Sequence, residues 1–160
     1  MHGRYFNPDD YLETSTGRVF TPERSAVAFE RAYEDLESAL RRASPDARLF
    51  LVVGVQGAGK TTWVQQHADA LGSSAFFFDA ALPRAVHRAR ALSIARACGV
   101  PAVAVWVQAP LEVALTRNQL RRADHRVPDA AIHSVHSMME PPSISEGFVE
   151  VQKASAPTRS

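Results

Sequence analysis

The stretch GVQGAGKTTW, residues 54–63, has the residue types and spacing of a loop that binds phosphate groups. Gly54, Gly59, Lys60 and Thr61 match the pattern G-x-x-x-x-G-K-[ST] completely. In such a loop the glycines let successive backbone N–H groups surround a phosphate, and the following helix contributes the positive end of its dipole. The lysine reaches the terminal phosphates and the threonine hydroxyl ligates magnesium. The sequence therefore predicts a site for ATP and Mg²⁺. The loop residues expected to contact the nucleotide are Gly54, Gln56, Gly57, Ala58, Gly59, Lys60, Thr61 and Thr62.

An aspartate at the end of an apolar run is the second candidate for chemistry. Residues 75–79 read AFFFD, which predicts a buried strand with Asp79 at its carboxyl end. P-loop proteins often carry an acid facing the metal at this point. We expect Asp79 to reach the magnesium ion through water or to orient an acceptor hydroxyl. A surface-turn aspartate is the alternative.

Two arginines supply candidate cations for a phosphoryl group. The sequence TRNQLRR places Arg117 and Arg121 four residues apart, which puts them on one face of a predicted helix. An ATP-consuming phosphotransferase needs cations on the group in transfer, and lid arginines commonly supply them. We expect both residues to contact the nucleotide and to act in catalysis. A solvated basic helix face is the alternative.

Composition limits the remaining possibilities. The net charge of +1 provides no global positive field, so nucleic-acid binding would need a local basic groove. The single cysteine, Cys98, excludes an internal disulfide and fits a reducing cytoplasm. No apolar run approaches the roughly 18 residues of a membrane span, and no membrane partner is expected. The six histidines show no ligand spacing that predicts a metal site.

Apolar runs alternate with helical patterns along the chain. Strands are predicted at residues 4–7, 49–53, 75–79, 102–107 and 148–151. Helices are predicted at residues 21–43, 61–71, 84–99, 110–123 and 128–139, and TSTG at 14–17 is read as a loop. This alternation predicts an α/β P-loop NTPase or kinase fold, with a parallel sheet covered by helices on both faces. We expect one domain over residues 1–152 and a flexible tail over 153–160.

Three segments together resemble the kinase domain of polynucleotide 5′-hydroxyl kinases. They are GVQGAGKTTW, FFFDAALPRAVHRARALSIARACGVPAVAVWVQAPLEVALTRNQLRR and VPDAAIHSVHSMMEPPSISEGFVEV. That family follows its P-loop with an Asp-ended strand, an Arg/Ala-rich helix, a lid of the form R-N-x-x-x-R, a "VP" helix and a closing "P…EGF" segment. The resemblance covers residues 49–151. It implies transfer of the ATP γ-phosphate to a nucleic-acid hydroxyl, with DNA the foremost partner.

One element of that family is missing from its usual place. The family carries a second strand, ending in an acid of the type N-R-D-D-Y, between the P-loop helix and the Asp-ended strand. Here residues 72–74 leave no room for it. Residues 1–43, with RYFNPDDYL at their start, resemble that strand, its acid and the helix that follows. We therefore expect a permuted order, which a parallel sheet allows because neighbouring strands need not be consecutive in sequence.

The permuted order implies roles for the acids. Asp9 falls on the position of the general base, with Asp10 beside it, and together with Asp79 they are the expected contacts to the acceptor. If the segment is not moved, Asp79 becomes the expected base. A turn or helix start is the alternative reading of NPDD.

Two departures from the family put the acceptor in doubt. Leu12 stands where some relatives carry a phosphate-binding arginine, and Ala80 and Ala81 stand where relatives place Thr or Asn. Both losses remove polar contacts near the acceptor, which favours a substrate other than a plain nucleic-acid 5′ end. The expected acceptors are a 5′-hydroxyl and a hydroxymethyl group on a modified base in DNA. A small molecule such as a sugar, nucleoside or antibiotic is one alternative. A nucleotide-binding module without transfer is another.

Overall fold

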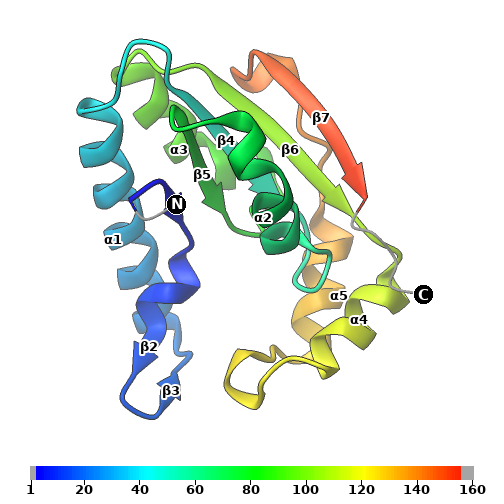
Figure 1. Ribbon diagram of the computed structural model, residues 1–160. Helices are drawn as coiled ribbons and strands as arrows, with labels where there is room; N and C mark the ends of the chain where they lie inside the picture. The colour runs from blue at the N-terminus through cyan, green and yellow to red at the C-terminus, as the bar shows by residue number, and fades with distance from the viewer. Residues whose placement is uncertain (1–2, 156–160) are drawn as a thin grey trace.

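A five-stranded parallel sheet forms the centre of the computed structural model, which describes residues 3–155 (Figure 1). Its strand order is β1-β5-β4-β6-β7, and each neighbouring pair is parallel. The strands are β1 (Tyr5–Phe6), β4 (Arg48–Val53), β5 (Ala75–Asp79), β6 (Ala102–Gln108) and β7 (Glu150–Ser155). The five predicted strands are therefore present.

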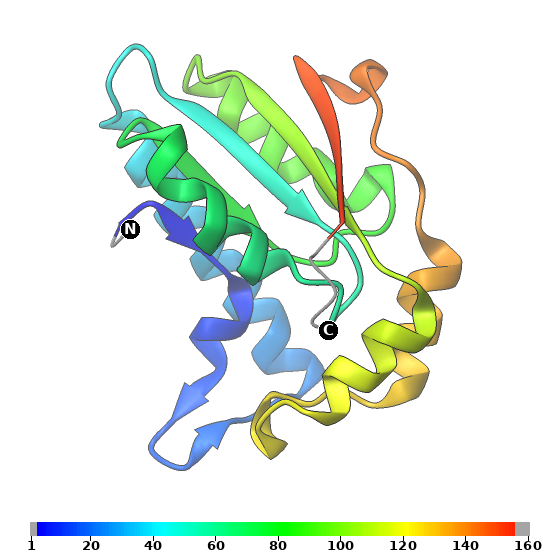
Figure 2. The same cartoon turned by 45° about the vertical axis from the view of Figure 1, so that its right-hand side comes forward.

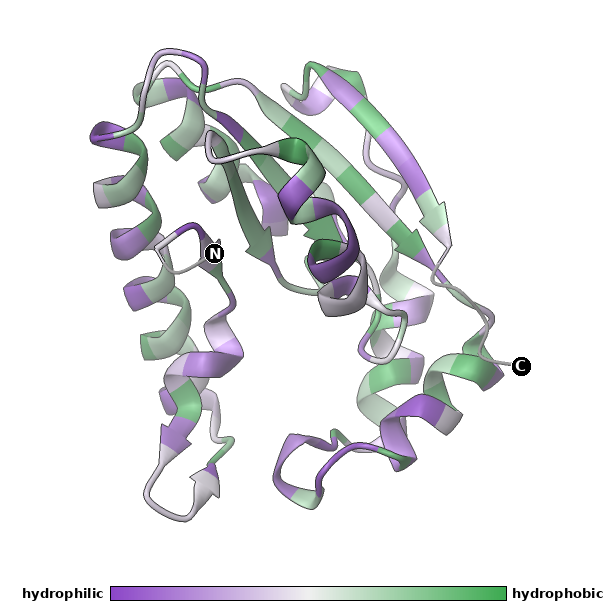
Figure 3. Ribbon diagram, in the orientation of Figure 1, coloured by the Kyte–Doolittle hydropathy of each residue, from purple (hydrophilic) through white to green (hydrophobic). Residues whose placement is uncertain are grey.

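Helices cover both faces of this sheet. They are α1 (Pro22–Arg41), α2 (Lys60–Leu71), α3 (Ala85–Ala97), α4 (Leu111–Gln119) and α5 (Asp129–Met138). Alternate residues of β4 enter different cores, since Leu49 and Leu51 pack with α1 and α3 whereas Phe50 and Val52 pack with α2 and α5. The apolar colouring of the inner strands follows this double burial (Figure 3). The prediction of an α/β P-loop fold is confirmed. None of the helices in the described part of the chain is long and apolar enough to cross a membrane.

The first helix begins as its sequence predicts. The Thr21 hydroxyl accepts a hydrogen bond from the Arg24 backbone N–H at 3.1 Å, and Pro22 occupies the first turn. Tyr33, Leu36 and Leu40 are buried along one face. Phe29 is half-buried at the end of that face nearest the P-loop crevice.

Three segments differ from the predictions by more than one or two residues at an element end. Strand β7 continues to Ser155, so the expected boundary at residue 152 falls inside a strand; residues 156–160 of the predicted tail lie outside the described part. Residues 14–17, read as a loop, form most of the hairpin of β2 (Glu13–Thr14) and β3 (Gly17–Arg18). Helix α4 ends at Gln119, four residues before the predicted end at residue 123, and the chain then turns toward the segment that precedes α5.

The short strand β1 lies at the edge of the sheet beside β5. Tyr5 pairs with Phe77 and Phe6 pairs with Phe78. The side chain of Arg4 donates hydrogen bonds to the backbone oxygens of Gly72 (2.7 Å) and Ala75 (2.9 Å) and so secures the start of the strand. Since parallel strands end at a common edge, this pairing carries the 3-10 helix η1 (Pro8–Leu12) to the edge where the P-loop lies (Figures 1 and 2). Leu12 is buried, so it serves the core.

A buried ion pair attaches the closing segment to the sheet's helical layer. The Arg88 side chain, fully buried on α3, donates to both carboxylate oxygens of Glu146 at 2.8 and 3.0 Å. Its Nη1 also donates to the Leu82 backbone oxygen at 2.9 Å. Glu146 lies in the 3-10 helix η3 (Ile144–Glu146), two residues before the buried Phe148. The ion pair with Arg88 gives the glutamate of the Glu-Gly-Phe sequence at residues 146–148 a structural role.

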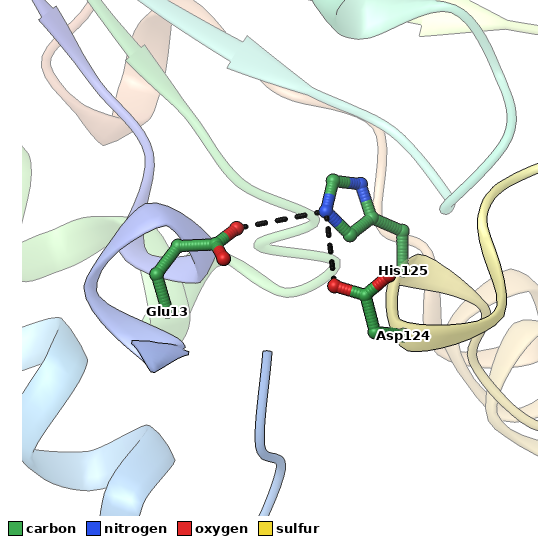
Figure 4. Close-up of side chains that lie close together, drawn as sticks. All are labelled: Glu13, Asp124 and His125. Carbon is green, nitrogen blue, oxygen red and sulfur yellow. Dashed lines mark ion pairs between the residues drawn. The ribbon is translucent and has the colours of Figure 1, made fainter. Parts of the chain in front are cut away.

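The hairpin β2–β3 touches the segment that links α4 to α5. The Arg18 backbone N–H donates to Asp124 Oδ2 at 3.0 Å, and this bond is the main reason that the pKa of Asp124 falls to about 2. His125 Nε2 lies 3.5 Å from both Glu13 Oε1 and Asp124 Oδ2, forming an ion pair when the imidazole is protonated (Figure 4). Asp124 and His125 belong to the 3-10 helix η2 (Ala123–His125). The N-terminal hairpin and the segment between α4 and α5, which lie on either side of the P-loop, are thus in contact with each other.

Replacing Arg88 by alanine tests the buried pair. We expect Arg88→Ala to lower the free energy of unfolding by about 3–5 kcal/mol, because Glu146 would keep a charge in a largely buried place without its partner. Arg90→Ala is the matched control: Arg90 makes the same two-bond contact with Glu30 on the exposed side of α3. Urea denaturation of both variants should show a large loss for the first and little change for the second. Equal losses would contradict this account.

A methyl group at Gly17 tests the contact between the hairpin and η2. A Cβ at this position would lie 2.8 Å from Asp124 Oδ2, and the glycine has φ +113°. Gly17→Ala should therefore speed amide hydrogen exchange at residues 120–127. Gly99→Ala is the control, because Gly99 also has positive φ (+68°) but open space around it. Unchanged exchange in the first variant would show that the contact does not restrain this segment.

Candidate nucleotide and acceptor site

A crevice of about 440 Å³ opens beside the P-loop, at the carboxyl edge of the sheet. Four parts of the chain line it: residues 7–29, the P-loop with the start of α2, residues 79–81 at the end of β5, and the segment from α4 to Val127. The lining side chains that bear on chemistry are Asp9, Gln56, Lys60, Thr61, Thr62, Asp79, Arg117 and Arg121. The N-terminal segment and the P-loop therefore face one common space, although they are far apart in sequence.

The P-loop backbone has the conformation that its glycines permit. Gly59 immediately precedes α2 with φ +106°, and no side chain caps the helix there. Gly57 packs so closely on α4 that an added Cβ would lie 2.4 Å from the Ala114 backbone oxygen. The uncapped N–H groups at the start of α2 suit the oxygens of a phosphate. Gly54 and Ala58 do not line the crevice but offer backbone oxygens to Lys60 and Arg117.

The Lys60 ammonium is held at the loop by backbone oxygens. It donates to the oxygens of Gly54 at 3.0 Å and Val55 at 3.2 Å. Burial lowers the pKa of Lys60, while the negative charges of Asp79 and Asp9 oppose that shift. A phosphate in the crevice would add negative charge beside this cation and favour its protonated form.

Asp79 and Thr61 meet where a magnesium ion would be needed. The Thr61 hydroxyl donates to Asp79 Oδ2 at 3.0 Å, and Asp79 is only 2% exposed at the end of β5. A hydroxyl and a carboxylate are oxygen ligands of the kind that magnesium prefers. The donor set therefore fits Mg²⁺ bound with a nucleotide.

The two N-terminal acids occupy different surroundings. Asp9 is half-buried and lines the crevice, with its backbone N–H donating to Asn7 Oδ1 at 2.9 Å. Asp10 is exposed, does not line the crevice, and pairs with the Arg18 guanidinium at 2.9 Å. Partial desolvation of its carboxyl raises the pKa of Asp10, and the charge of Arg18 opposes this. Asp10 was predicted to contact the acceptor, but in the structure it lies outside the crevice and forms an ion pair with Arg18.

Both predicted arginines line the crevice, but they do not share a helix face. Arg117 on α4 donates to the Ala58 backbone oxygen at 3.1 Å. Arg121 comes after α4 has ended, and the turn directs it to the same crevice. The fully buried Asn118 secures this turn: its Nδ2 donates to the Val127 oxygen at 2.6 Å and its Oδ1 accepts from the Val127 N–H at 3.1 Å.

Part of the crevice lining is apolar. Phe20 and Phe29 line it from the chain before and within α1, and Val127 lines it from the opposite wall. Ala80 and Ala81, which follow Asp79, also line it. This wall suits a group with a flat or apolar surface next to its reacting hydroxyl.

Some functional neighbours were outside the reach of sequence reasoning. Tyr5 was predicted only as part of a strand, yet its hydroxyl donates to Asp79 Oδ2 at 2.5 Å.

The ligand atoms of Glu13, Asp124 and His125 lie within 4.8 Å of one another, as those of a metal site would, although no histidine spacing predicted this. Arg18 and Arg122 already pair with these two carboxylates, so ion pairing accounts for the cluster.

A comparison with protein families supports the nucleotide site. A family model described as an AAA domain matches residues 72–142, from the end of α2 to the segment after α5. The match begins after the P-loop, so the loop motif and the family match are separate pieces of evidence. Sheet order, motif and match together identify a P-loop nucleotide-binding domain of kinase-like architecture.

Proposed function

We propose that the protein is an ATP-dependent kinase that transfers the γ-phosphate to a hydroxyl of a nucleic acid. The acceptor is a 5′-hydroxyl or a hydroxymethyl group on a modified base in DNA. The observation that carries the proposal is the shared crevice: Asp9 faces the same space as the phosphate-binding Lys60 and the arginines Arg117 and Arg121. A site for nucleotide alone would not need a carboxylate on the opposite wall.

The P-loop residues hold the nucleotide in this proposal. Lys60 and the N–H groups at the start of α2 bind the phosphates, while Thr61 and Asp79 hold magnesium, directly or through water. Bound ATP·Mg²⁺ supplies the γ-phosphoryl group and the cation that neutralises its oxygens. The chain's own residues position these charges.

Asp9 is the general base. A base must lie within hydrogen-bond reach of the hydroxyl whose proton it takes, and Asp9 lines the wall facing the P-loop. Its carboxylate accepts the proton as the acceptor oxygen attacks phosphorus in line with the departing diphosphate oxygen. Lys60, Arg117 and Arg121 stabilise the charge on the group in transfer.

The N-terminal element completes the kinase domain in permuted order. Strand β1, η1 and α1 take the place of the strand, acid and helix that polynucleotide kinases carry after the P-loop helix. The pairing of β1 with β5 supports this, because it places the segment beside the Asp-ended strand.

A small-molecule acceptor is the second candidate. The observation that favours it lies in the N-terminal wall, where Arg18 is engaged by Asp10 and Glu13, so its charge is already compensated. A long nucleic acid would gain more from cations that face solvent.

Asp9→Asn tests the base. We expect transfer to fall by about 10²–10⁴-fold while ATP affinity stays within a factor of two to three, because a base acts on the transition state. Asp10→Asn is the neighbouring control and should lose far less. Radiolabelled γ-phosphate transfer and equilibrium binding of ATP give the two readouts. Full activity of the Asp9 variant would assign the base elsewhere, with Asp79 the next residue to test.

A panel of acceptors tests the substrate class. Labelled ATP is offered to DNA and RNA with 5′-hydroxyl ends, to hydroxymethylated DNA, and to sugars, nucleosides and aminoglycosides. For a nucleic-acid acceptor, the efficiency of transfer should fall steeply as salt rises from about 50 to 200 mM, since phosphate contacts release counterions. Transfer to a small molecule with a flat salt dependence would favour the second candidate. No transfer to any acceptor, with ATP still bound, would point to a nucleotide-binding module.

A further inference from the structure

The phenol of Tyr5 reaches from the edge strand to the carboxylate that faces the P-loop. Tyr5 lies on β1, opposite Phe77 of β5, two residues before Asp79. Its hydroxyl is 2.5 Å from Asp79 Oδ2 and 3.4 Å from Thr61 Oγ1. A residue from the N-terminal segment thus contacts the expected magnesium site directly.

The hydrogen-bond directions in this group are fixed by chemistry. The Asn7 amide Nδ2 can only donate, and it does so to the Tyr5 oxygen at 3.1 Å. The Tyr5 proton is therefore available for Asp79 Oδ2, which also accepts the Thr61 hydroxyl at 3.0 Å.

Two donors on one carboxylate oxygen hold its orientation. With a single hydrogen bond the Asp79 carboxylate could still rotate about that bond. Tyr5 on β1 and Thr61 on α2 donate to Oδ2 from two different elements, and together they restrict this rotation. The Thr61 oxygen keeps lone pairs for a cation while its proton goes to Asp79. Groups that orient metal ligands in this way commonly affect metal affinity strongly.

We propose that Tyr5 is a positioning residue that holds Asp79 in the orientation needed for magnesium to bind with the nucleotide at Thr61. The proposal rests on the proposed function for its cation, but it concerns the metal and not the acceptor. It makes the N-terminal segment serve the nucleotide half of the crevice through Tyr5, in addition to the acceptor half through Asp9.

Tyr5→Phe removes the donor and keeps the ring. We expect the Mg²⁺ concentration that supports half-maximal binding of a fluorescent ATP analogue to rise about 10-fold. Binding without Mg²⁺ and the urea midpoint should follow those of the control. The control variant is Tyr11→Phe, because Tyr11 also donates to a carboxylate, Asp35 Oδ2, at 2.5 Å. Neither Tyr11 nor Asp35 lines the crevice.

The magnesium titration separates this proposal from the kinase assignment. A 10-fold shift in Tyr5→Phe but not in Tyr11→Phe supports the positioning role, even if no acceptor is phosphorylated. The same magnesium dependence in both variants, or a loss of binding that is equal with and without Mg²⁺, overturns it. Where transfer is measurable, added Mg²⁺ should restore most of the rate of Tyr5→Phe, which a purely structural defect would not allow.

Discussion

The parallel pairing of β1 with β5 is the contact on which the proposed active site depends. Only two residues, Tyr5 and Phe6, make this strand, but Phe6 is buried and the pairing continues the sheet beyond β5. Without it, the P-loop would keep its phosphate-binding backbone, and the acid on the opposite wall would have no fixed place. In the proposed mechanism, the short strand therefore joins nucleotide binding to acceptor chemistry.

The second wall is positioned by polar contacts of a different kind. Asn118 closes the turn after α4, and Arg117 joins that helix to the P-loop, so the arginines stay at the crevice although no continuous helix carries both. At the outer end, Asp124 and His125 meet the N-terminal hairpin. Movement of this wall and of the hairpin should consequently be coupled, because each is the other's neighbour at the mouth of the crevice.

Local sequence patterns predicted the sheet and its helices because burial on two faces leaves continuous apolar runs, as in residues 49–53 and 75–79. The P-loop was predictable because its chemistry needs fixed spacing within a few residues. The partners of Asp79 and Arg88 were not, since Tyr5 and Glu146 lie far away in sequence and only the fold brings them together. The end of α4 was missed for a related reason: a buried side-chain contact, not a helix-breaking residue, turns the chain.

The central claim is that a carboxylate near the start of the chain faces the γ-phosphate across the crevice and receives the acceptor's proton. A crystal structure with magnesium, a non-hydrolysable ATP analogue and an oligonucleotide with a 5′-hydroxyl end tests it most directly. We expect the hydroxyl to lie within about 3 Å of the Asp9 carboxylate and in line with the β–γ bridge. A hydroxyl bound to Asp79 instead, with Asp9 turned to solvent, would contradict it.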